Sequence, residues 1–177
     1  MNETTDENFE KIVQLMIFWS EQWQAHILEH GTPLDERQTV YAQHVGVTAP
    51  EKVRVLKVPN VPMPHYEILQ KAFIENNVFS LDANGLTLEY GIFIKQGVFP
   101  VEYWLTHELV HVAQCERIGG LSPSMRQYLK ECLTDGYGES VLEKEAHETA
   151  LKCLEQHNSF VFKLISNNAI NSADSDK

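Results

Sequence analysis

His107-Glu108-Leu109-Val110-His111 is a segment whose residue types and spacing could bind a metal ion and use it. In a helix, two histidines four residues apart lie on one face, so both imidazoles can reach a single divalent ion. Zinc is the usual occupant of such a pair. Glu108 would lie beside the ion and could take a proton from the water bound there, which is the general-base role in a zinc peptidase.

The alternative for this motif is a pair of solvated histidines, because a five-residue match also arises by chance. The flanking sequence favours the metal site because it predicts the helix that the motif needs. No helix breaker follows Pro100, and Gly119-Gly120 stands where a left-handed C-cap would be expected. The histidines and Glu108 lie off the apolar stripe of this helix, which consists of Leu105, Leu109 and Val112.

A catalytic zinc site needs a third protein ligand and an open fourth position. Cys115 cannot supply the ligand, because a helix climbs about 12 Å and turns about 80° between His107 and Cys115. The acid-rich segment 131–148 is the expected source, and within it we prefer Glu143. Residues 140–157 form a predicted amphipathic helix with Ser140 as its N-cap, and Glu143 lies at the edge of the buried face.

Two other acids and one other role remain open at this stage. Glu145 falls on the solvated side of the predicted helix, and Glu139 would face inward but precedes the N-cap. Glu143 itself could close a capping box with Ser140 instead of binding a metal.

The combination of His107-Glu108-x-x-His111 with Glu143-Lys144-Glu145-Ala146-His147 resembles the gluzincin class of metallopeptidases. The wider segment from about residue 85 to 150 is similar to small bacterial zincin-like proteins. The resemblance implies zinc at His107, His111 and Glu143, with Glu108 as the base. An aspartate usually follows the ligand glutamate by four residues in that class, whereas this chain has His147, to which we assign a possible role in orienting a ligand.

An additional donor is expected to stabilise the oxyanion that forms when the peptide carbonyl is attacked. The sequence does not rank the candidates, which are Tyr137, Tyr128, Arg126 and His147.

Residues 86–94 alternate between apolar and other side chains, which predicts a strand ahead of the metal-site helix. In zincins an edge strand at this place pairs with an extended substrate, so we expect Gly91, Ile92 and Phe93 to hold a peptide by main-chain hydrogen bonds. The alternative is an ordinary sheet strand with its own partners. Gly91 indicates a bulge or a close backbone approach.

The rest of the chain is predicted to be scaffold in a single zincin-like domain, 1–177. We expect two N-terminal helices within 7–46, a sheet region at 53–97, the metal-site helices at 101–157 and a frayed tail at 166–177. The remaining histidines have no partner at ligand spacing and are expected to be ordinary surface or core residues; they are His26, His30, His44, His65 and His157.

Composition agrees with a compact enzyme. The chain has 177 residues, of which 43% are hydrophobic, enough for one full core. A formal net charge of −11 argues against nucleic acid and anionic membranes as partners. Three cysteines without framework spacing, an acidic N-terminus and the lack of a long apolar run predict a cytoplasmic protein with reduced thiols.

We therefore expect an α+β fold in which a small, mostly antiparallel sheet packs on the metal-site helix and further helices. The expected function is that of a zinc-dependent peptidase acting on a peptide or protein substrate. Two alternatives stay open: a metal-binding interaction or regulatory module that cleaves nothing, and a hydrolase of a non-peptide amide or ester.

Overall fold

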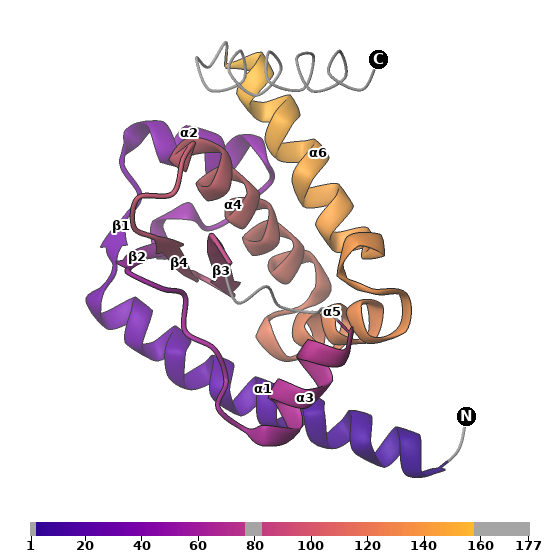
Figure 1. Ribbon diagram of the computed structural model, residues 1–177. Helices are drawn as coiled ribbons and strands as arrows, with labels where there is room; N and C mark the ends of the chain where they lie inside the picture. Colours follow the sequence, from indigo (N-terminus) through magenta and orange to yellow (C-terminus); the bar gives the residue numbers. More distant parts are fainter. Residues whose placement is uncertain (1–2, 77–82, 158–177) are drawn as a thin grey trace, which may run out of the picture.

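Figure 1 shows the computed structural model, which describes residues 3–76 and 83–157 and is α+β, mostly helical, with a small mixed sheet. The predicted tail at 166–177 lies outside the described residues. In chain order the elements are α1 (Glu3–His30), β1 (Thr32–Pro33), α2 (Glu36–His44), the 3-10 turn η1 (Pro50–Lys52), β2 (Arg54–Val58), α3 (Glu67–Asn76), β3 (Gly85–Leu88), β4 (Gly91–Lys95), α4 (Val101–Ile118), α5 (Leu121–Asp135), the 3-10 turn η2 (Tyr137–Glu139) and α6 (Val141–Gln156).

The four strands are ordered β1-β2-β4-β3. The two outer pairings are antiparallel, as expected, whereas the central pairing of β2 with β4 is parallel. A parallel pair needs a long crossover connection, and the chain makes it through α3 and β3.

Helices cover both faces of the sheet, with α1 on one side and α4 on the other (Figure 1). Ile92 and Ile94 of β4 pack in a core cluster with residues of α2, α4 and α6. Phe93 points the other way into a second cluster, made by residues of α1, α3 and α5. Because β4 is buried on both faces, its apolar residues run consecutively from Ile92 to Ile94.

The predicted strand over residues 86–94 is two strands joined by a turn at Glu89-Tyr90, where Glu89 has a left-handed φ of 54°. In the sequence the apolar residues alternate without a break across this turn, so the period of two did not reveal it, although Leu86 and Leu88 pack in one core cluster and Ile92 and Ile94 in the other. The hairpin pairs Thr87 with Ile92 and therefore places Thr87 on the face that meets α4.

Gly91 lies where α1 approaches the sheet closely, as expected: a Cβ there would come within 3.1 Å of the Ile27 side chain. The prediction that Gly91, Ile92 and Phe93 pair with a substrate is wrong, because β4 is already paired with β2 and with β3 along its length. Within the described residues, β3 is the strand beside α4 that pairs on one side only.

Helix α4 ends as predicted, at Gly119 in a left-handed conformation with a φ of 112°. Glu116 near its end holds the loop after α2, accepting hydrogen bonds from the backbone nitrogens of Thr48 (2.7 Å) and Ala49 (3.1 Å). Helix α6 packs along α4 through buried apolar side chains. The two helices that carry the candidate metal ligands are therefore fixed against each other.

No helix within residues 3–76 and 83–157 is both long enough and apolar enough to cross a bilayer. The cysteines Cys115, Cys132 and Cys153 are all free and buried.

Candidate metal centre

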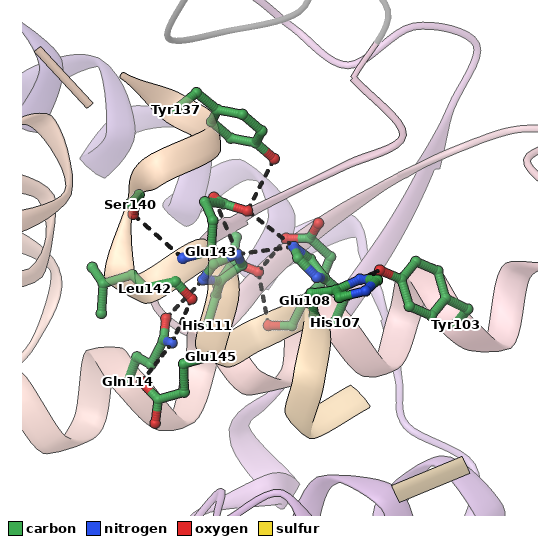
Figure 2. A network of polar contacts seen from close by, with 12 residues as sticks. Tyr103, His107, Glu108, His111, Gln114, Tyr137, Ser140, Leu142, Glu143 and Glu145 are labelled. Carbon is green, nitrogen blue, oxygen red and sulfur yellow. Dashed lines mark hydrogen bonds and ion pairs between the residues drawn. The ribbon is translucent and has the colours of Figure 1, made fainter. Parts of the chain in front are cut away.

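His107 and His111 of α4 and Glu143 of α6 converge on one point (Figure 2). The Nε2 atoms of the two histidines are 3.1 Å apart. The Glu143 carboxylate lies 3.3 Å from Nε2 of His107 and 3.5 Å from Nε2 of His111. The first contact is made by Oε2 of Glu143 and the second by Oε1, and one ligand atom from each of the three residues lies within 4.8 Å of the other two.

This donor set fits zinc. Tetrahedral zinc with its usual bonds to nitrogen and oxygen holds its ligand atoms about 3.4 Å apart, and the nitrogen–nitrogen distance and the two nitrogen–oxygen contacts lie between 3.1 and 3.5 Å. Two imidazoles and one carboxylate are also the ligand types of a catalytic zinc site with an open fourth position. The residues present therefore fit a zinc ion in both type and spacing.

Glu143 reaches the histidines because α6 begins where the sequence predicts. Ser140 is the N-cap, and its hydroxyl accepts a hydrogen bond from the Glu143 backbone nitrogen at 3.3 Å. The Glu143 carboxylate does not close a capping box but faces the histidines and accepts a hydrogen bond from the Tyr137 hydroxyl at 2.9 Å. Burial by itself raises the pKa of Glu143, but the hydrogen bonds and charges of the histidines outweigh it and lower the pKa.

The two alternative acids are held elsewhere. Both oxygens of Glu145 pair with the guanidinium of Arg117 at 2.7 Å. Glu139 belongs to η2, is largely exposed and pairs with Lys144. Neither carboxylate contacts His107 or His111 among the described interactions.

Gln114, which the sequence analysis did not single out, orients His111. Its side-chain nitrogen donates to the Leu142 carbonyl (2.9 Å) and to Glu145 (3.0 Å), both of which can only accept. Its side-chain oxygen therefore faces Nδ1 of His111, at 2.8 Å. Nδ1 must carry the hydrogen, which leaves the lone pair of Nε2 for a metal. Burial lowers the pKa of His111, yet hydrogen bonding to Glu143 and the nearby carboxylates raise it to about 9.

His107 is oriented differently. Its Nδ1 is buried and has no hydrogen-bond partner within the part of the chain that the structure describes. The rings of Tyr103 and Trp104, each centred 6.1 Å from the imidazole, hold it by packing.

Replacing Gln114 by Met should weaken zinc binding by about 10- to 100-fold, the usual cost of losing a group that orients a histidine ligand. Methionine keeps an unbranched side chain in this buried position but cannot accept from Nδ1 of His111. Competition with a chromophoric chelator measures the affinity. Gln127→Met is the matched control, because Gln127 bonds only to Glu131 on the exposed face of α5. Equal affinities for the two variants would show that Gln114 does not orient a ligand.

Glu108 is buried between α4 and β3. Its carboxylate accepts a hydrogen bond from the Thr87 hydroxyl at 2.7 Å. A Cβ at Gly85 would lie 2.5 Å from the other carboxylate oxygen, so only glycine leaves room for this side chain. Burial raises the pKa of Glu108, which makes the carboxylate a stronger proton acceptor. Sequence analysis missed Thr87 and Gly85, whose roles depend on the hairpin.

Two of the four candidate oxyanion donors lie at the candidate ligands, and two bond to residues elsewhere. Tyr137 bonds to Glu143, and Tyr128 lines the cavity beside the histidines. His147 instead bonds to the Tyr103 hydroxyl through Nδ1 at 2.6 Å, and within the described residues it makes no hydrogen bond or ion pair with a candidate ligand. Arg126 is exposed and forms a bidentate ion pair with Glu10 of α1, so its predicted role as a donor in the site is wrong.

A cavity of about 340 Å³ opens over the three candidate ligands. Gly85, Leu86 and Thr87 of β3 form one wall. The opposite wall is mainly apolar and includes Leu121, Met125 and Tyr128 of α5. The cavity is large enough for the side chain of a substrate beside the metal position.

Comparison of the chain with protein-family models, with curated proteins and with solved structures finds no match, so its function has to be inferred from the site itself.

Proposed function

We propose that this chain is a zinc-dependent peptidase with a zincin-like fold. The observation that carries the proposal is the placement of Glu108: a buried carboxylate beside three zinc-type donors, at the floor of a cavity. A site that only bound a metal would need His107, His111 and Glu143 but would have no use for this fourth group. Glu108 therefore favours catalysis over a binding module.

Zinc bound by the three residues would polarise the substrate carbonyl and acidify the attacking water. Glu108 would take the proton of that water and later deliver it to the leaving amine. The Thr87 hydroxyl, which donates to one Glu108 oxygen, holds the carboxylate in place for both transfers.

Tyr137 is the best placed of the candidate donors to the oxyanion. Burial and the nearby Glu143 raise its pKa, so the hydroxyl stays protonated and can donate a hydrogen bond. It already donates to Glu143, one of the three candidate ligands, so its hydroxyl lies beside the proposed metal position.

A peptide is the substrate that the site favours over other amides and esters. Among the described residues β3 is unpaired along its edge away from β4; this strand borders the cavity and offers main-chain groups to an extended chain. Gly85–Leu88, and not residues 91–93, would therefore pair with the substrate through main-chain hydrogen bonds. The apolar wall on α5 would take an apolar side chain next to the cleaved bond.

A peptide-library screen tests this proposal. The zinc-loaded protein should cleave peptides at neutral pH, chelation should abolish the cleavage, and added zinc should restore it. Cleavage of small amides or esters without any peptide cleavage would favour the non-peptide hydrolase. If well-metallated protein cleaves neither, the proposal is overturned in favour of a binding module.

A further inference from the structure

A second group of metal-ligating side chains lies at the far end of α6 from Glu143. His44, the last residue of α2, meets Cys153 and His157 from the C-terminal turns of α6. One nitrogen of each histidine and the Cys153 sulfur all lie within 4.8 Å of one another. The expectation that His44 and His157 have no partner at ligand spacing is therefore wrong.

Local geometry brings these three side chains together. Cys153 and His157 are four residues apart and so lie on one side of α6, the same spacing that His107 and His111 have on α4. The rings of His44 and His157 meet edge to face with their centroids 5.0 Å apart. The ring of buried Tyr41 packs against the imidazole of His157, with the two ring centres 5.2 Å apart.

We propose that His44, Cys153 and His157 form a second transition-metal site, with zinc as the preferred ion. One thiolate and two imidazoles are ligands that zinc favours over magnesium or calcium, which prefer oxygen. Zinc would hold the three atoms about 3.3–3.7 Å apart. Both histidines are exposed, so small rotations of their side chains close the remaining gap, and water can fill the fourth position.

Binding has a definite proton balance. Burial raises the pKa of Cys153 to about 11, so the free thiol is neutral at pH 7. As the metal binds, the S–H bond breaks, its electron pair forms the bond from sulfur to the ion, and one proton passes to the solvent. The ion would tie the end of α2 to the end of α6, the helix that carries Glu143 at its other end.

Cobalt titration of the metal-free full chain tests the site. Cobalt bound to a thiolate shows a near-ultraviolet charge-transfer absorption, and none of the ligands at the first site contains sulfur. We expect this absorption to be lost in Cys153→Ser and in His44→Asn/His157→Asn, to reverse on adding zinc, and to saturate at one cobalt per chain once the first site has been removed. It should persist in His107→Ala/His111→Ala, which separates this site from the proposed peptidase site.

Matched controls keep the result specific. Cys132→Ser removes a cysteine as fully buried as Cys153, and His30→Asn removes one of two exposed histidines that stack on α1. Both variants should keep the absorption. If Cys153→Ser does not fold, the cobalt absorption of His44→Asn/His157→Asn, in which only exposed side chains are changed, tests the site. A missing absorption, or one that survives His44→Asn/His157→Asn, overturns the proposal.

A thermal measurement gives an independent readout. In the His107→Ala/His111→Ala protein, zinc at about a hundredfold excess over its Kd should raise Tm by about 5–10 °C through the second site. Adding His44→Asn and His157→Asn should remove that shift. A shift that remains in the four-residue variant contradicts the assignment.

Discussion

Glu108→Gln should reduce kcat/KM by about two to four orders of magnitude, the usual contribution of a positioned acid or base. The amide keeps the size of the side chain, and its oxygen can still accept the hydrogen bond from Thr87. It cannot, however, take a proton from the attacking water. Zinc affinity should stay near that of the wild type, because Glu108 is not one of the three converging ligands.

Thermal stability separates lost chemistry from lost structure in this variant. Glu108 is buried, and burial disfavours its charged form, so a neutral amide should leave Tm equal to or above that of the wild type. Glu102→Gln is the matched control: it lies on the same helix but pairs with Arg37 away from the cavity. Equal turnover by Glu108→Gln and wild type would remove Glu108 as the base.

Local spacing predicted the parts of this molecule that depend on one helix. Helical geometry places His107 and His111 together, and the N-cap at Ser140 determines the direction in which Glu143 points. Gln114 could have been found in the same way, because it follows His111 by three residues and shares its helix face. The pair Cys153 and His157 could also have been found in this way, because its spacing of four residues repeats that of the two histidines on α4.

Features that depend on contacts between distant segments could not be predicted from spacing. Apolar residues alternate in the sequence through the turn at Glu89-Tyr90, although Leu88 and Ile92 face opposite sides of the sheet, so the sequence does not distinguish one strand from a hairpin. That turn decides which strand has a free edge and brings Thr87 to Glu108. Arg126 finds its partner Glu10 more than a hundred residues away in the sequence, which no local pattern indicates.

Zinc affinity should fall by more than about 100-fold in Glu143→Ala, since loss of a ligand costs more than loss of a group that only orients one. Glu145→Ala should stay within a few-fold of wild type, because Glu145 pairs with Arg117 and reaches the site only through Gln114. Both changes are best made in a His44→Asn/His157→Asn background, so that chelator competition reports the first site alone. Gln114→Met is measured in the same background.

The order of these losses identifies the third ligand. Equal losses, or a greater loss in Glu145→Ala, would move the assignment to Glu145, and a large loss in Glu139→Ala would mean that η2 supplies the ligand. The largest loss of zinc affinity is expected in His107→Ala/His111→Ala. In the His44→Asn/His157→Asn background this variant should retain no stoichiometric zinc. It should also gain no stability from added zinc, because binding to the native site is what links the metal to folding. Unchanged zinc content in this double variant would contradict the metal centre itself, and with it the chemistry assigned to Glu108.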